Sequence, residues 1–210
     1  MIPIRDTNPT KRTPFITYLL ITINVLVFVY MYTLGRSQLV VFLRDHAFIP
    51  ADFSTLDLFT SLFLHGGVLH LVVNMIFLYI FGDNIEDYLG HFKFLLFYLL
   101  VGALASLAHF AINSQSTVPT LGASGAIAGT MGAYLLLYPN SQIDVVVPLF
   151  LFFPVLRVPA FTMIVYWVIY QLLQGFSSVL TQVGAGIAYF AHIGGFFSGL
   201  LLIKALKNFK

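Results

Sequence analysis

Long apolar stretches separated by short polar ones make up most of this chain. Six stretches are apolar over the length of a membrane-spanning helix or slightly less, at 15–34, 68–88, 91–113, 123–138, 159–175 and 186–206. A helix needs about 20 apolar residues to cross the hydrocarbon core of a bilayer, and fewer when it is buried among other helices. The pattern therefore predicts an all-α membrane protein, a bundle of six transmembrane helices.

Two segments break this pattern. Residues 35–67 mix charged residues with aromatic and aliphatic ones, which is too polar to span a bilayer and too apolar to be a free loop. We expect an interfacial loop between helices 1 and 2. Residues 139–158 are apolar but contain Pro139, Pro148 and Pro154, which disfavour a helix. A seventh span there is the less favoured interpretation. Together with the loop predicted at 175–186, the interfacial loop is expected to control access of water and substrate.

The chain is interpreted as one domain. Residues 1–14 form a short cytoplasmic N-terminal tail, 15–206 the six-helix membrane domain and 207–210 a cytoplasmic C-terminal tail. The first apolar run is too long for the core of a cleaved signal peptide, and no small-residue cleavage site follows it. It is therefore expected to remain as a membrane span.

Composition agrees with a lipid environment. Hydrophobic residues make up 59% of the 210 positions and charged residues only 9%, against about 25% charged in soluble domains. The chain has no cysteine, which excludes disulfides, thiolate metal sites and cysteine nucleophiles. We expect no metal and no cofactor. The lipid bilayer is the expected surrounding partner, the net charge of +2 gives no basic patch for nucleic acid, and the oligomeric state stays open.

Lys and Arg are distributed unevenly between the two sides of the predicted bundle. With the N-terminus inside, the inner side carries Arg5, Lys11, Arg12, Lys93, Arg157, Lys204, Lys207 and Lys210, and the outer side only Arg36 and Arg44. Positive residues are enriched in cytoplasmic loops. A multi-pass protein of the cell membrane with both termini in the cytoplasm is therefore predicted.

Polar side chains inside the spans gather at one depth. His65, His70 and Asn74 lie at the start of the second span, Ser124 starts the fourth and His192 lies near the start of the sixth. These spans run in the same direction, so all the starts face the outer side. Because polar residues within a membrane are costly, they are candidates for function.

Glycines accompany two of these polar residues. Gly125 and Gly129 follow Ser124, and Gly195 and Gly199 follow His192. Small residues at this spacing let membrane helices approach closely. We expect the glycines to be helix-packing residues that bring Ser124 within reach of His192.

Serine and histidine together support nucleophilic catalysis, because histidine takes the proton that otherwise weakens the serine hydroxyl as a nucleophile. The apolar parts of spans two, four and six hold no Asp or Glu, so a dyad rather than a triad is predicted. Ser124 at a helix start offers free backbone N–H groups. His70 and Asn74, four residues apart on one face, can add side-chain donors to an oxyanion hole.

These residues resemble a known family. The run FLHGGVLHLVVNMIFLYIFGDNIEDYLG, the GASG at 122–125 and the AHIGG at 191–195 resemble the rhomboid proteases in order and spacing, from about residue 57 to 203. The resemblance implies that Ser124 is the nucleophile and His192 its general base. It also implies an oxyanion hole of His70, Asn74 and the Ser124 backbone, with His65 and Gly122 lining the site. The implied substrates are transmembrane proteins, cleaved near the outer membrane face.

Two departures from the family leave questions open. Many rhomboids carry Trp-Arg where this chain has Leu56-Asp57, and several have a tyrosine against the catalytic histidine where this chain has Ala128. The group that orients His192 is therefore not identified from sequence.

The polar residues also have interpretations that involve no catalysis. Ser124 and Asn74 can serve helix packing, and His65 can be an interfacial residue. A catalytically inactive rhomboid-like protein that binds and escorts membrane proteins is the main alternative function. Asp83, Glu86 and Asp87, at the cytoplasmic end of the second span, are expected to be solvated or capping charges.

Overall fold

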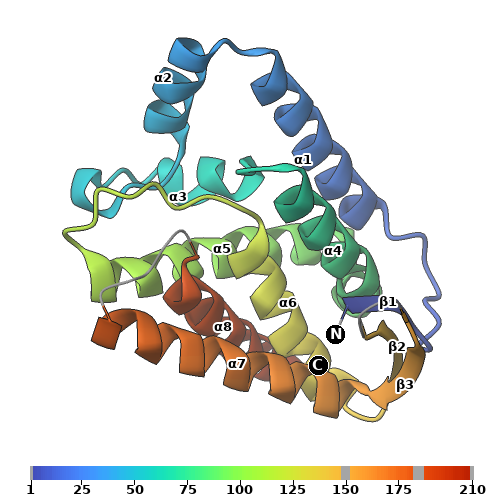
Figure 1. The fold of residues 1–210 in the computed structure, drawn as a ribbon. Coiled ribbons are helices and arrows are strands. Elements are labelled where there is room, and N and C mark those ends of the chain that lie inside the picture. The colour runs from blue at the N-terminus through green and yellow to red at the C-terminus, as the bar shows by residue number, and fades with distance from the viewer. Residues whose placement is uncertain (1, 148–151, 182–186, 209–210) are drawn as a thin grey trace.

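The computed structural model describes residues 2–147, 152–181 and 187–208 and is dominated by helices (Figure 1). Its α-helices are α1 (Phe15–Thr33), α2 (Arg36–His46), α3 (Asp57–Thr60), α4 (Val68–Leu89), α5 (His91–Asn113), α6 (Ser124–Leu137), α7 (Ala160–Thr181) and α8 (Tyr189–Asn208). Two 3-10 turns, η1 (Pro50–Asp52) and η2 (Ser61–Phe63), and three strands, β1 (Ile2–Asp6), β2 (Gln142–Val146) and β3 (Val155–Pro159), complete the described elements.

Each of the six predicted spans coincides with a helix. In the described part of the chain, α1, α4, α5, α7 and α8 are long and apolar enough to cross a membrane, whereas α6 has only 14 residues. The fifth span was predicted too short, since α7 continues to Thr181. Residues 175–181, expected in a loop, are thus its last turns, and 182–186 lie outside the described residues.

The two ends of the bundle differ in what covers them. β1, the end of α8 and the strands β2 and β3 lie at one end, and the segment between α1 and α4 lies at the other (Figure 1). That segment folds into α2, α3 and the two 3-10 turns. It is tied to the loop before α6 by backbone hydrogen bonds between Phe48 and Thr120 in both directions, at 2.8 and 3.0 Å. We call the first end the inner end and the second the outer end.

A small sheet at the inner end corrects the prediction of a purely helical fold. The three strands are antiparallel in the order β1-β2-β3. Prolines around 139–158 disfavour a helix, and valines and isoleucines in each strand favour extended backbone instead. The sheet buries Ile143 and Val145 of β2 against the helices. β1 lies within the stretch predicted as an N-terminal tail, whose backbone therefore pairs with the loop between α6 and α7.

The contact between α6 and α8 is made of glycine and backbone. A Cβ atom added to Gly195 would collide with the carbonyl oxygen of Gly125, and one on Gly199 with that of Gly129. A Cβ on Gly129 would in turn lie 2.8 Å from the Gly195 carbonyl oxygen. All four predicted helix-packing glycines therefore lie where the two helices touch. No larger residue fits without moving the helices apart.

Glu86 at the inner end is buried rather than solvated, being only 1% exposed. Its carboxylate accepts hydrogen bonds from the backbone N–H groups of Ile16 and Thr17 at 2.8 and 2.7 Å, and from the Thr17 hydroxyl at 2.7 Å. α1 has no capping side chain of its own. Because the first N–H groups of a helix lack intrahelical partners, Glu86 of α4 caps α1 from outside. Of the three acidic residues in this region, Glu86 thus departs furthest from a solvated charge.

Candidate active site

Ser124 and His192 lie in hydrogen-bonding contact although 68 residues separate them. The Ser124 Oγ is 2.7 Å from Nε2 of His192. Ser124 is the first residue of α6, and His192 lies in the first turn of α8. The glycine contact between these helices brings their backbones together directly below the pair. The short distance is therefore a consequence of helix packing and not of a flexible loop.

The other nitrogen of His192 also has a partner, which sequence reasoning missed. Its Nδ1 lies 2.7 Å from the Oε1 atom of Gln171, a residue of α7 that is 6% exposed. Trp167, one turn earlier on α7, has its ring centroid 5.9 Å from that of His192. A glutamine inside an apolar span was a visible signal, since polar residues there are functional candidates. The partner could not be paired from sequence because α7 and α8 have no motif that fixes their relative rotation.

Gly122 lies between the predicted oxyanion-hole side chains. Its φ of +123° is a conformation that residues with a side chain rarely adopt. A Cβ atom here would lie 2.9 Å from Nε2 of His70 and 3.6 Å from Nδ2 of Asn74. The Gly122 N–H is bonded to the Ser61 carbonyl oxygen at 2.9 Å, which fixes this loop. Two side-chain nitrogens therefore face a small space two residues before Ser124.

Asn74 and His65 are buried with unused polar atoms. Asn74 is 6% exposed, and its Nδ2 has no hydrogen-bond partner among the described residues. His65 is 1% exposed, and within residues 2–147, 152–181 and 187–208 neither of its ring nitrogens has a partner. Its ring packs edge-to-face on His70 at 5.1 Å. Leaving a buried donor unsatisfied costs about 1–3 kcal/mol, so these groups reduce the stability of the fold.

An open cavity of about 1170 Å³ lies beside the Ser124–His192 pair. Its lining includes Ser124, His192, His70 and Gly122. His109 of α5, which the sequence did not single out, lines the same cavity. The cavity is bounded by the starts of α4, α6 and α8 and by the loop before α6. It is large enough for several residues of an extended peptide.

The chemistry of the cavity is that of neutral polar groups. Among the described residues, no carboxylate is hydrogen-bonded to Ser124 or His192; their partners are each other and Gln171. A hydroxyl with a base at hydrogen-bond distance and nearby N–H donors is the set that acyl transfer requires.

Comparison with known proteins shows which family the chain is similar to. A profile of the Rhomboid domain matches residues 52–209. Rhomboid protease GluP of Bacillus subtilis (strain 168) is 36% identical over 126 residues, which is 58% of this chain and 24% of the relative. Rhomboid protein 1, mitochondrial, of Saccharomyces cerevisiae is 33% identical over 137 residues, 61% of this chain and 38% of the relative. RHOMBOID-like protein 6, mitochondrial, of Arabidopsis thaliana is 34% identical over 111 residues, 44% of this chain and 36% of the relative. The chain thus spans well under half the length of each.

Proposed function

The chain belongs to the rhomboid family, and from that premise we propose that it is an intramembrane serine endopeptidase whose nucleophile is Ser124 and whose general base is His192. The single observation that carries the proposal is the 2.7 Å contact between Ser124 Oγ and His192 Nε2 at the wall of a large cavity. One of the similar proteins, GluP of Bacillus subtilis, is named a protease.

The proposed reaction is hydrolysis of a peptide bond in two halves. Ser124 attacks the carbonyl carbon while Nε2 of His192 takes the hydroxyl proton. The histidine passes that proton to the leaving amine, and an acyl-enzyme with Ser124 remains. A water molecule then gives its proton to His192 and attacks the ester. Release of the acid returns the proton from His192 to Ser124 and restores the enzyme.

In both halves of the reaction, negative charge develops on the carbonyl oxygen of the substrate, and hydrogen-bond donors are needed to stabilise it. We assign this role to the Ser124 backbone N–H at the start of α6, to His70 Nε2 and to Asn74 Nδ2, because the two side-chain nitrogens border the space beside Gly122. Each such donor typically contributes about 2.7–4 kcal/mol to the transition state. His65 packs behind His70 and is assigned a supporting position at the site.

The substrates are proposed to be transmembrane proteins cleaved in or near their membrane segments. The chain is an integral membrane protein by its apolar helices and its family. We further propose six spans with α6 as the short fourth one, a location in the cell membrane, both termini in the cytoplasm, and a site open to the outer face. The excess of Lys and Arg at the inner end supports this orientation.

A rhomboid-like protein that binds membrane proteins without cleaving them is the alternative. Some similar proteins carry names that state no protease activity, such as RHOMBOID-like protein 6 of Arabidopsis thaliana. Against this alternative stands the paired geometry of Ser124 and His192, because binding alone does not require a base at hydrogen-bond distance from a hydroxyl.

The deciding experiment compares the wild type with Ser124→Ala and His192→Ala in liposomes that contain a generic single-span substrate. We expect cleavage and labelling of Ser124 by a fluorophosphonate in the wild type, and neither in Ser124→Ala. For His192→Ala we expect loss of cleavage with an unchanged unfolding temperature. A wild type that neither cleaves several substrates nor reacts with the fluorophosphonate would contradict the protease function and favour the escort alternative.

A further inference from the structure

Catalysis by His192 requires a particular tautomer of its ring. To accept the proton of Ser124, Nε2 must carry the lone pair, and the hydrogen of the neutral ring must then be on Nδ1. The described residues within hydrogen-bond distance of the ring are Ser124 on one side and Gln171 on the other. A group beside Nδ1 therefore decides whether the base is available.

Gln171 presents an atom that enforces this choice. Its Oε1 lies 2.7 Å from Nδ1 and has no hydrogen to donate, so Nδ1 must be the donor. The side chain is 6% exposed, which keeps water from competing for the bond. Trp167, one helical turn away on α7, lies beside the same ring, with 36° between the ring planes. α7 thus holds His192 through a hydrogen bond and an aromatic contact together.

We propose that Gln171 is the positioning residue of the catalytic base, acting through its amide oxygen to hold His192 in the tautomer and rotation that Ser124 requires. The proposal rests on the proposed function of Ser124 and His192. It answers what orients His192 in a chain that has Ala128 four residues after Ser124 on α6, because the orienting groups come from α7.

The titratable groups around His192 allow a specific test. Ser124 faces it from α6, and the titratable side chains that act on it electrostatically are His70 on α4 and His109 on α5. In Gln171→Glu a carboxylate would accept the same Nδ1 hydrogen and stabilise the protonated ring. In Gln171→Leu the bulk remains but the acceptor is lost. Tyr170→Leu is the matched control, since Tyr170 is the preceding residue of α7 and is 46% exposed.

The experiment measures kcat, KM and the rate of fluorophosphonate labelling from pH 5 to 9 in liposomes. For Gln171→Leu we expect kcat and the labelling rate to fall about 10- to 100-fold, which reaches only the lower limit of a general base's typical contribution of about 10²- to 10⁴-fold because His192 itself remains, with KM within about twofold. For Gln171→Glu we expect near wild-type kcat at high pH and an acid limb displaced to higher pH. Tyr170→Leu should match the wild type.

Two results would overturn the proposal. In the first, Gln171→Leu keeps the wild-type kcat. In the second, Gln171→Leu and Gln171→Glu lose activity equally, in proportion to their unfolding temperatures and with an unshifted pH profile. A wild type that is itself unreactive to the fluorophosphonate would instead overturn the proposed function, so the two failures are distinguishable.

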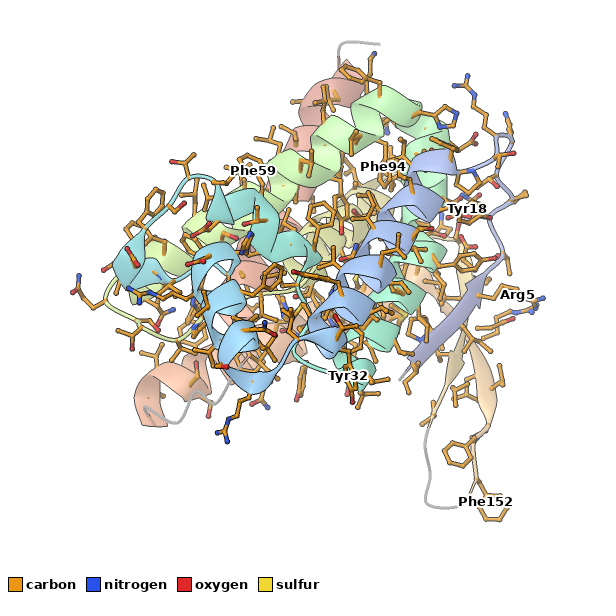
Figure 2. The ribbon with its side chains drawn as sticks, turned by 90° about the horizontal axis from the view of Figure 1, so that it is seen from above. Arg5, Tyr18, Tyr32, Phe59, Phe94 and Phe152 are labelled. Atoms are coloured by element: carbon orange, nitrogen blue, oxygen red, sulfur yellow. The ribbon has the colours of Figure 1, made fainter. Side chains whose placement is uncertain are left out.

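An independent observation concerns the hairpin formed by β2 and β3. The sequence between its strands is VPLFLFFP, and the described residues Phe152 and Phe153 are 76% and 63% exposed. Figure 2 shows Phe152 at the far end of the hairpin, which projects sideways from the helices. β3 ends at Pro159 and α7 begins at Ala160, so the hairpin runs directly into a membrane-spanning helix.

We infer that Phe152 and Phe153 insert into the headgroup region of the membrane that the bundle spans. These two exposed phenylalanines are held beside the end of a span, at the depth where amphipathic segments bind. Arg157 of β3 and Arg5 of the neighbouring strand β1, whose side chains are 56% and 68% exposed, both pair with one largely buried carboxylate, Asp144 of β2. Two guanidinium groups against one carboxylate suit anionic lipid headgroups.

The absence of cysteine makes the test direct. Phe153→Cys and, as a control, Asn140→Cys in the exposed turn after α6 each receive one nitroxide label in liposomes with anionic lipid. We expect the label at 153 to be accessible to oxygen and protected from a water-soluble nickel chelate, and the label at 140 to be open to the chelate. Equal chelate access at both sites would overturn the inference. So would spin–spin broadening at 153 that disappears on dilution with unlabelled protein, since a second copy would then cover the hairpin.

Discussion

The carboxylates at the inner end of the bundle differ in hydrogen bonding from two buried polar side chains near Ser124 at the outer end. At the inner end the carboxylates of Glu86, Asp6 and Asp144 all have hydrogen-bond donors. At the outer end Asn74 Nδ2 and both ring nitrogens of His65 have none in the part of the chain that the structure describes. A satisfied polar group adds stability, whereas an unsatisfied one costs about 1–3 kcal/mol. The inner carboxylates therefore stabilise the fold, whereas the unpaired groups at the outer end cost stability; under the proposed function, Asn74 is kept as a donor for the substrate.

Between the two ends, the glycine contact of α6 and α8 should be the most sensitive place in the molecule. Gly199→Ala puts a methyl group onto the Gly129 carbonyl oxygen, so the helices must separate and Ser124 must leave His192. We expect loss of cleavage and of most of the folded protein. Both are measured by substrate cleavage and by thermal unfolding in detergent.

Gly175→Ala is the matched control for this substitution. Gly175 is also a helical glycine facing a neighbouring helix, but a Cβ there would lie no closer than 3.4 Å to any side chain. Alanine favours a helix by about 1 kcal/mol over glycine, so this variant should be as stable as the wild type or slightly more. Equal behaviour of the two variants would show that the α6–α8 contact tolerates expansion.

At the inner end, Glu86→Ala should have the largest effect on stability alone. It leaves the N–H groups of Ile16 and Thr17 and the Thr17 hydroxyl without their acceptor, each at about 1–3 kcal/mol. We expect a loss of several kcal/mol in the free energy of unfolding. In the molecules that remain folded, kcat should stay near the wild-type value, since the site lies at the other end.

The neighbouring carboxylate Asp87 is the matched control. It accepts hydrogen bonds from the backbone of Lys11 and Arg12 at an exposed position, at 3.2 and 3.0 Å. Water replaces an exposed acceptor easily, so Asp87→Ala should cost far less than Glu86→Ala. Denaturant titration of the three proteins in the same detergent measures this order, and a reversed order would contradict the division between the two ends.

At the outer end, Asn74→Ala should lower activity without lowering stability. Removing a donor that has no partner among the described residues should leave the unfolding temperature unchanged or raise it. If Asn74 stabilises the oxyanion, kcat should fall about 10²- to 10³-fold. Asn24→Ala is a control inside α1, away from the site, because the Asn24 amide bonds only the Leu20 carbonyl oxygen of its own helix. A parallel loss of stability and activity in Asn74→Ala would mean that Asn74 is a packing residue.

The contrast between the ends also explains what the sequence could predict. The helices followed from apolar length, and the meeting of Ser124 with His192 followed from glycines beside each of them, because such stripes determine which faces touch. The role of Gln171 was missed because its long side chain reaches His192 from α7, and the sequence of α7 has no glycine stripe to indicate which of its faces touches α8. The sheet was missed because 139–158 has helix-breaking prolines but the partner strand of β2 lies far away, in residues 2–6. Of the two roles that the sequence left open for Glu86, solvated or capping, the structure shows capping. Its burial depends on how α1 packs against α4, which no local sequence pattern predicts.

The smallest expected effect concerns the ion pairs of the sheet. Hydrogen bonds from Arg157 and Arg5 lower the pKa of Asp144 to about 2, against about 3.9 in unfolded chains. Because the folded pKa is the lower one, the stability from this group is complete above about pH 4–5 and is lost as the pH falls toward 2.

Arg157→Ala should therefore lower the unfolding temperature slightly at pH 7, and the difference from the wild type should shrink between pH 4 and 2. Arg36→Ala, on α2 at the outer end, should show no such pH dependence. A difference for Arg157→Ala that stays constant with pH would mean that packing of the arginine stem, and not its charge, supports the sheet.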